Sequence, residues 1–160
     1  MIMPNISIRK MIKNDTSQIL EILNKWNMAP SEPSKENPDP ERTSLLIENT
    51  FVAVDGEKIV GVCSYIVLSE ELAETASLAV NPDYRGTGLG FLLQKARLQE
   101  MTERGIKIVR TETDRPATIA WYIRKFGYRL IGKNPKKHNF SLADVDHWTI
   151  LELNLDDYEI

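Results

Sequence analysis

Residues 78–90 read Leu78-Ala79-Val80-Asn81-Pro82-Asp83-Tyr84-Arg85-Gly86-Thr87-Gly88-Leu89-Gly90. The first three residues end a run typical of a strand, and leucines at helical spacing follow the last glycine. Glycines between a strand and a helix let the backbone take positive φ angles and approach a ligand without an intervening Cβ. The first amides of the helix lack intrahelical acceptors, and the helix dipole favours anions there. The segment therefore predicts an anion site suited to phosphate, to which Arg85 adds a charge-assisted contact.

Three further roles for a glycine-rich turn fit these residues less well. A tight connection without a ligand accounts for a pair of glycines better than it accounts for three. A Walker A loop requires Gly-Lys-Ser/Thr at its end, whereas Gly90 precedes Phe91-Leu92. A Rossmann fingerprint requires Gly-x-Gly-x-x-Gly directly after a strand, whereas the spacing here is Gly-x-Gly-x-Gly and residues 81–85 intervene. We therefore expect a phosphate site of another fold type.

The pattern on either side of the turn predicts one mixed α/β sheet flanked by helices. Alternating or β-branched runs between turn residues predict strands, and apolar stripes at helical spacing predict helices. Pro116 and Gly127 suit the beginning and the end of the last helix. A proline-rich segment, 29–40, is expected to be a loop. The expected strands are 6–8, 51–54, 59–68, 72–80, 106–111, 128–131 and 148–155, and the expected helices are 16–26, 41–48, 89–104 and 116–126.

Composition favours one soluble domain that spans residues 1–160. Hydrophobic residues make up 42% of the chain and charged residues 27%, as in a globular protein with a core. A net charge of −3 gives no general attraction to nucleic acid or to a membrane surface, so neither is expected as a partner. No apolar run approaches the roughly 20 residues that span a bilayer, and the N-terminus lacks a signal-peptide pattern. These features and the single cysteine, Cys63, predict a cytoplasmic protein, and the two widely spaced histidines predict no metal site.

The glycine turn resembles the signature of the GNAT superfamily of acetyltransferases. That signature is commonly written V-x-P-x-x-R-x-x-G-x-G, and every fixed position is present from Val80 to Gly90. The resemblance extends over most of the chain, from the expected strand at Ile8-Arg9 to the last strand. It implies a mixed, mostly antiparallel sheet of about seven strands flanked by about four helices.

The resemblance also implies acetyl-coenzyme A (acetyl-CoA) as the co-substrate. The backbone along Leu78, Ala79 and Val80 would pair with the pantetheine arm as if it were another strand. In this family the strand at 72–80 splays away from the strand at 106–111, and the thioester enters the gap. The pyrophosphate would bind the amides of Arg85, Gly86, Thr87, Gly88, Leu89 and Gly90.

The catalytic acid that the resemblance implies is Tyr122. Attack of an amine on the thioester needs a base, a donor for the oxyanion and an acid for the departing thiolate. The family's acid is a tyrosine in the helix before a Gly-Phe pair, here Gly127-Tyr128. The usual spacing to the glycine is four residues, whereas Tyr122 lies five residues before it and Ile123 takes the usual place. Because one step rotates a side chain by about 100° around a helix, a purely structural role for Tyr122 stays open.

Two glutamates are candidate bases. Glu74 lies at the beginning of the expected strand 72–80, and Glu112 follows the strand 106–111. A solvated carboxylate is the alternative role for each. An asparagine that the family commonly has after the second of these strands is replaced here by Asp114-Arg115-Pro116. Lys136-Lys137-His138 could attract an acidic substrate or the 3′-phosphate of coenzyme A, or form a solvated face.

Together these features predict an acetyl-CoA-dependent N-acetyltransferase that acts on a primary amine of a small molecule or peptide by direct attack in a ternary complex. A non-catalytic acyl-CoA-binding module and an acyltransferase with a longer acyl donor stay open. The acceptor surface is expected at 27–48 and 132–147, where an acidic rim suits an amine or a basic peptide. Pairing of two copies through edge strands is expected as well. The rim comprises Glu32, Glu36, Asp39, Glu41 and Glu48, opposite Lys133, Lys136 and Lys137.

Overall fold

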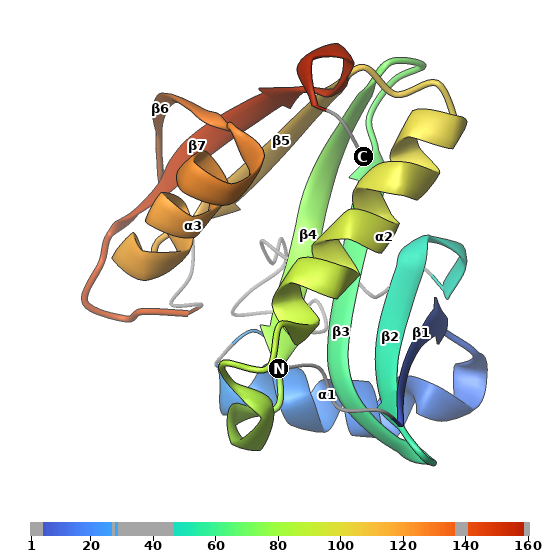
Figure 1. The fold of residues 1–160 in the computed structure, drawn as a ribbon. Coiled ribbons are helices and arrows are strands. Elements are labelled where there is room, and N and C mark those ends of the chain that lie inside the picture. The colour runs from blue at the N-terminus through green and yellow to red at the C-terminus, as the bar shows by residue number, and fades with distance from the viewer. Residues whose placement is uncertain (1–4, 27, 29–46, 137–140, 159–160) are drawn as a thin grey trace, which may run out of the picture.

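Seven strands form one sheet in the order β1-β2-β3-β4-β5-β7-β6 (Figure 1). The computed structural model describes residues 5–26, 28, 47–136 and 141–158. All neighbouring strands are antiparallel except β4 and β5, which run parallel. The mixed, mostly antiparallel sheet expected from the sequence is thus confirmed. The strands are β1 Ile6–Lys10, β2 Thr50–Asp55, β3 Lys58–Val67, β4 Leu72–Val80, β5 Ile108–Thr113, β6 Arg129–Pro135 and β7 His147–Asn154.

Three α-helices lie in the described part of the chain: α1 Thr16–Lys25, α2 Leu89–Glu103 and α3 Pro116–Phe126. The sequence predicted a fourth at 41–48, but most of that segment is outside the described residues. Its end belongs to a single 3-10 turn, η2, Ile47–Asn49. The expected loop at 29–40 also lies outside the described residues. The remaining 3-10 turns are η1 Lys13–Asp15, η3 Pro82–Tyr84 and η4 Leu155–Asp157.

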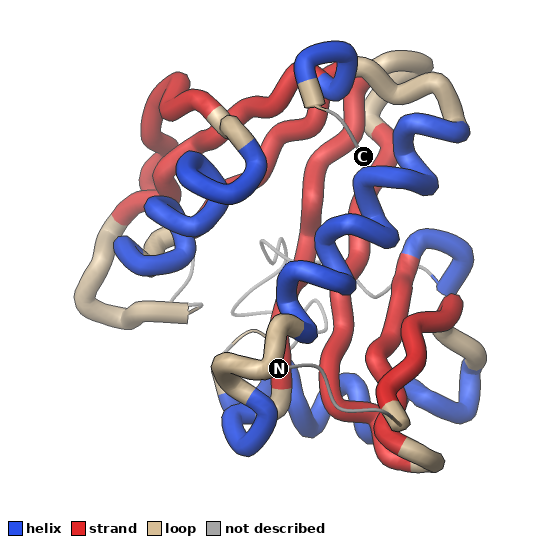
Figure 2. Tube along the Cα trace, in the orientation of Figure 1, coloured by secondary structure: helices blue, strands red, loops and turns tan. Residues whose placement is uncertain are grey.

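The helices cover both faces of the sheet (Figures 1 and 2). Ile19 and Leu23 of α1 pack with Val52 in a core on one face. Leu93 of α2 packs with Ala53 in a core on the other face. Because successive strand residues point to opposite faces, neighbouring residues of β2 contribute to different cores. α3 lies on the same face as α2, and both helices contribute to a third core over β5 and β7.

Element boundaries differ from the sequence prediction by up to four residues. The strand expected at 106–111 is β5 Ile108–Thr113. Its start is delayed because the amide of Ile106 still donates to Met101 O at the end of α2, at 3.0 Å. β6 runs on to Pro135 because it pairs with β7 as far as His147. The hairpin expected at Asp55-Gly56 is present between β2 and β3.

Cys63 lies in the core between β3 and α2 and is fully buried. Burial raises the pKa of its thiol to about 11, because the thiolate would lose hydration there. We expect iodoacetamide to label the folded chain at least about 100-fold more slowly than the urea-unfolded chain at about pH 8, because the thiolate is the nucleophile. Mass spectrometry of timed samples measures both rates, and equal rates would contradict this burial.

Candidate functional site

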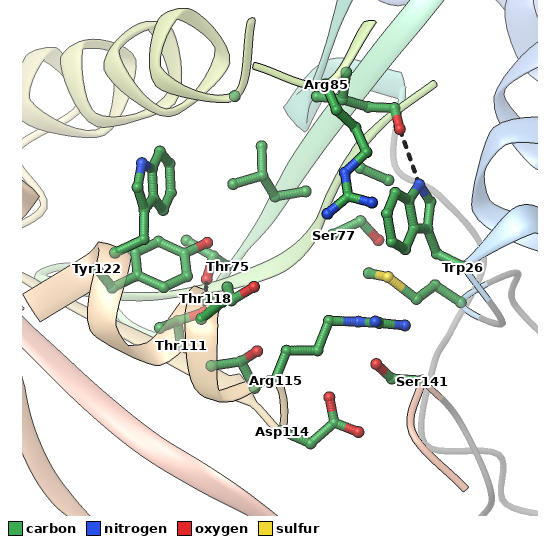
Figure 3. Close-up of a pocket in the computed structure, with 18 of the residues that line it drawn as sticks. Trp26, Thr75, Ser77, Arg85, Thr111, Asp114, Arg115, Thr118, Tyr122 and Ser141 are labelled. Carbon is green, nitrogen blue, oxygen red and sulfur yellow. Dashed lines mark hydrogen bonds between the residues drawn. The ribbon is translucent and has the colours of Figure 1, made fainter. Parts of the chain in front are cut away.

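A cleft opens where the parallel strands β4 and β5 separate. Cα pairing runs from Leu72 opposite Ile108 to Thr75 opposite Thr111, and residues 76–80 of β4 have no partner in β5. The Thr75 hydroxyl donates to the Thr111 hydroxyl at the point of divergence. The cleft has a volume of about 570 Å³ (Figure 3). The splay that the family resemblance implied is therefore present.

The glycine turn forms one end of this cleft. Gly86 and Gly88 have φ angles of +75° and +87°, and Gly88 is the N-cap of α2. Only glycine adopts this left-handed region at low cost, which explains the residue type at both positions. A Cβ placed on Gly86 would meet no atom of the described residues within 4 Å, so the space beside it is open with respect to them. All nine predicted cofactor-binding residues, 78–80 and 85–90, line the cleft.

Local hydrogen bonds hold the turn in shape. The Asn81 side chain accepts from the amide of Asp83 at 3.0 Å, and the Thr87 hydroxyl donates to Tyr84 O at 2.5 Å. The amide of Arg85 donates to Pro82 O at 3.3 Å. The amides that follow, at the N-terminus of α2, have no acceptors within the helix. These amides are the donors that the turn offers to an anion.

A β-bulge in β4 lies at the floor of the cleft. Ser77 pairs with Ser64 and Thr75 pairs with Tyr65, so Ala76 has no opposite residue in β3. Ala76 has no opposite residue in β5 either, because pairing there stops at Thr75. The backbone around Ala76 is therefore outside the regular ladder on both sides, and it lines the cleft.

Arg97 of α2 is fully buried beside this bulge. Its Nη1 donates to Ser64 O at 2.9 Å and to Ser77 O at 2.8 Å. Its Nη2 donates to the Tyr122 hydroxyl oxygen at 3.2 Å and its Nε to Gln94 Oε1 at 3.0 Å. Buried cations require several acceptors, and the carbonyls on both sides of the bulge supply two of them. Arg97 thus connects the bulge in β4 to the side chain of Tyr122.

Tyr122 lies in the wall of the cleft, and its ring points into the pocket (Figure 3). Its exposed fraction is 3%, whereas Ile123 is 41% exposed and does not line the cleft. α3 is continuous from Pro116 to Phe126, so no helix irregularity is needed to bring the tyrosine there. Its ring also packs 4.9 Å from that of Tyr128, so the side chain belongs to both the core and the cleft.

The two candidate bases occupy different environments. Glu112 lines the cleft, and its Oε1 accepts a hydrogen bond from Asn134 Nδ2 of β6 at 2.7 Å. Glu74 does not line the cleft. It lies opposite Ile66 in β3 and Arg110 in β5, in the part of β4 that is paired on both sides. Of the two carboxylates, only Glu112 lines the cleft.

Trp26 and Arg115 are cleft residues that sequence reasoning did not identify as site residues. Trp26 follows α1, and its indole N–H donates to Val80 O at 2.9 Å, which fixes the ring against the end of β4. Arg115 lies between β5 and α3, and its guanidinium carbon is 5.0 Å from the centre of that ring. The only sequence signal near Arg115 was that Asp114-Arg115-Pro116 stands where the family commonly has an asparagine. That signal did not indicate a partner for Arg115.

Asp114 and Lys136 form a buried ion pair beside the cleft. Their side chains are 1% and 4% exposed, and Lys136 Nζ lies 2.7 Å from Asp114 Oδ2. The same oxygen accepts from the amide of Leu142 at 2.8 Å. Burial opposes ionisation of Asp114, but the hydrogen bonds from Lys136, Leu142 and Ser141 outweigh it, so its pKa is lowered. The pair ties the end of β6 and the segment before β7 to the beginning of α3.

We expect Asp114→Asn to lower the free energy of unfolding by about 3 kcal/mol near neutral pH, because it leaves the buried Lys136 charge uncompensated. A carboxyl whose pKa is lowered by folding stabilises above its unfolded pKa, and this contribution is lost as the pH falls through the folded pKa. The difference in unfolding free energy between the variant and the wild type should therefore shrink as the pH falls below the ordinary aspartate pKa of 3.8. Urea unfolding at several pH values measures it. Glu71→Gln, which removes an exposed pair with Lys107, should change stability by less than about 1 kcal/mol; equal losses for both variants would contradict the argument.

Several residues of the predicted acceptor surface are not described by the structure. Glu32, Glu36, Asp39, Glu41, Lys137 and His138 lie outside the described residues. In the described ranges, no group of three His, Cys, Asp or Glu side chains could hold a metal ion. No helix in those ranges has the length and hydropathy of a bilayer-spanning segment.

The chain belongs to the acetyltransferase (GNAT) family, whose sequence model matches residues 17–128. No curated protein matches the sequence significantly.

Solved structures share the fold at low sequence identity. Ard1 of Thermoplasma volcanium is 19% identical with a TM-score of 0.75, over 94% of this chain and 97% of that one. The ribosomal-protein-S18-alanine N-acetyltransferase of Escherichia coli is 20% identical with a TM-score of 0.71, over 94% of each chain. YncA of Salmonella typhimurium, solved with its cofactor acetyl-CoA, is 18% identical with a TM-score of 0.70, over 98% of this chain and 97% of that one.

Proposed function

We propose that this chain is an N-acetyltransferase that moves the acetyl group of acetyl-CoA to a primary amine of a small molecule or peptide, in a ternary complex. The observation that carries the proposal is one continuous cleft, which runs from the glycine turn along the unpaired half of β4 to Tyr122. Membership of the GNAT family and the likeness to YncA, which was solved with acetyl-CoA, support the choice of donor.

The donor's pyrophosphate would bind the amides from Gly86 to Gly90. Open space beside Gly86 and the N-terminus of α2 both favour an anion at this position. The arm of the donor would follow Leu78, Ala79 and Val80, whose backbone has no partner in β5. The acetyl group would then lie near the bulge at Ala76, where backbone outside the ladder could donate to an oxyanion.

Tyr122 would act as the acid. Because Arg97 donates to its hydroxyl oxygen, the hydroxyl hydrogen is directed away from Arg97 and can be donated to the departing thiolate. In the overall reaction the amine nitrogen forms a bond to the acetyl carbon and the carbon–sulfur bond breaks. The ammonium nitrogen loses two protons in becoming an amide: one is released to solvent through the base, and the other balances the proton that the thiolate gains from the acid.

Glu112 would accept the proton from the ammonium group of the acceptor. It lines the cleft beyond the point where β4 and β5 separate, and Asn134 holds its carboxylate. Glu74 lies in the paired part of β4, and we assign it no role in this reaction.

Release of free coenzyme A thiol on incubation of acetyl-CoA with a panel of amines tests the proposal. We expect amine-dependent thiol release, with an acetylated amine of the expected mass. Parallel reactions with propionyl-CoA and succinyl-CoA test the acyl chain length. Tight acetyl-CoA binding without turnover of any amine would favour the non-catalytic alternative. A cytoplasmic location and pairing of two copies through edge strands stay predictions.

A further inference from the structure

Two arginines share one aromatic ring inside the cleft. The guanidinium carbons of Arg85 and Arg115 lie 5.5 Å and 5.0 Å from the centre of the Trp26 indole. A guanidinium that stacks on an aromatic face keeps the N–H donors of its own plane available for hydrogen bonds. The Nε of Arg115 is buried and has no hydrogen-bond partner among the described residues. Because an unsatisfied buried donor costs free energy, it calls for an explanation.

Within the part of the chain that the structure describes, the anions of the cleft do not neutralise these arginines. The charged residues that line it are Arg85, Glu112, Asp114 and Arg115. Asp114 is paired with Lys136, and Glu112 accepts from Asn134. Neither arginine takes part in an ion pair among the described residues. The cleft therefore offers the guanidinium groups of two arginines to ligands.

The two guanidinium groups come from different walls of the cleft. Arg85 belongs to the glycine turn and is suited to the donor's pyrophosphate. Arg115 comes from the opposite wall and runs toward Trp26 and Ser141, away from Tyr122 (Figure 3). Met28, Leu142 and Trp148 also line the cleft, so apolar surface accompanies the charge.

We propose that the acceptor is an amine that carries a carboxylate, as an amino acid does, and that Arg115 binds this carboxylate through a bidentate pair. The proposal rests on the proposed function and narrows its substrate class. The planar fork of an arginine matches a carboxylate in geometry as well as in charge. Glu112, on the same wall three residues earlier, would then face the ammonium group, so the cleft is complementary to both charges of such an acceptor.

Binding of reaction products tests this without any need for turnover. N-acetyl-amino acids and the matching N-acetyl-amino amides differ only in the charged group, so a calorimetric titration of each pair isolates it. In the coenzyme A-saturated wild-type chain, we expect the best N-acetyl-amino acid to bind about tenfold or more tightly than its amide, because the amide lacks the charge that strengthens a hydrogen bond to a guanidinium.

Arg115→Gln should abolish this preference for the acid, and Arg115→Lys should restore part of it, because lysine keeps the charge but not the fork. Arg124→Gln is the matched control: it removes the same charge from an exposed position of α3 that does not line the cleft. It should leave the preference unchanged. Thermal unfolding of each variant checks that the fold is retained.

Three results would overturn the proposal. Absence of binding by every N-acetyl-amino acid, or equal affinity for acid and amide in the wild type, rules out a carboxylate site. If Arg115→Gln instead weakens acetyl-CoA binding and leaves the acid preference intact, Arg115 binds a phosphate of the donor. Failure of the proposed function would appear differently, as absence of thiol release with every amine, and the product titrations do not depend on it.

Discussion

Replacing Tyr122 by phenylalanine is expected to lower kcat by about 10²–10³-fold, which lies within the range of about 10²–10⁴-fold that general acid–base catalysis commonly contributes. The ring would stay in the aromatic cluster of α3, so the walls of the cleft would be retained. Only the hydroxyl that Arg97 contacts would be lost. Because this hydroxyl acts on the departing thiolate rather than on the bound donor, KM for acetyl-CoA should change little. Steady-state kinetics with thiol detection separates the two parameters.

Tyr128→Phe is the matched control for this variant. Tyr128 belongs to the same cluster and is buried, and its hydroxyl accepts from Gln94 Nε2 at 2.9 Å, but it does not line the cleft. We expect this variant to lose about 1 kcal/mol of stability, which is the usual contribution of a neutral hydrogen bond. Its kcat should stay within about threefold of wild type, because the hydroxyl that is lost does not face the cleft. If Tyr122→Phe keeps as much activity as Tyr128→Phe, Tyr122 is a structural aromatic and the acid lies elsewhere.

Placing a carboxylate in the glycine turn is expected to have the second large effect. Gly86→Asp should weaken acetyl-CoA binding by about 100-fold or more, because the new charge would lie beside the pyrophosphate. Asparagine and aspartate are the non-glycine residues that best tolerate the left-handed conformation, which Gly86 adopts at φ +75°. Gly86→Asn therefore has nearly the same shape and backbone cost without the charge, and it should weaken binding far less.

Calorimetry at two salt concentrations separates the charge from the conformation. The difference between Gly86→Asp and Gly86→Asn should shrink at high salt, because salt screens the repulsion. Gly105→Asp introduces the same residue at a similar φ, +86°, at the other end of α2, away from the cleft. It should leave acetyl-CoA binding unchanged. Equal binding by the two Gly86 variants would mean that no phosphate lies at this turn.

The elements that local sequence determines were predictable. The glycine turn is specified by residues within one short segment, since Gly86 and Gly88 must reach positive φ before α2 begins. Strand runs and the Asp55-Gly56 hairpin follow from side-chain alternation and turn chemistry in the same way. Several of their boundaries moved, as at Ile106, whose amide still donates to Met101 O at the end of α2.

The parts that depend on distant contacts were not predictable. Glu74 and Glu112 look equivalent in the sequence, yet the strands diverge at Thr75 and Thr111. Only the glutamate beyond that point lines the cleft. The register of α3 posed a similar problem, because counting residues cannot show which face of a helix meets the cleft. Tyr122 lies on that face and Ile123 does not.

Charged residues inside the protein were the least visible in the sequence. Arg97 reads as one of several polar residues on α2, but it is fully buried, where it donates to the carbonyls of Ser64 in β3 and Ser77 in β4 next to the bulge. Arg115 meets Trp26, a residue far away in the chain. Such pairs form only when the sheet brings β4, β5 and the end of α1 together, and no local pattern records them.

In the proposed function, the turn from Arg85 to Gly90 binds the pyrophosphate of acetyl-CoA. Calorimetric titration of the wild-type chain with acetyl-CoA and with S-acetylpantetheine, which lacks the pyrophosphate, tests it most directly. We predict a Kd for acetyl-CoA on the order of micromolar, and binding of S-acetylpantetheine that is weaker by about 100-fold or more. Absence of acetyl-CoA binding at about millimolar ligand, or equal affinity for the two compounds, would contradict the claim.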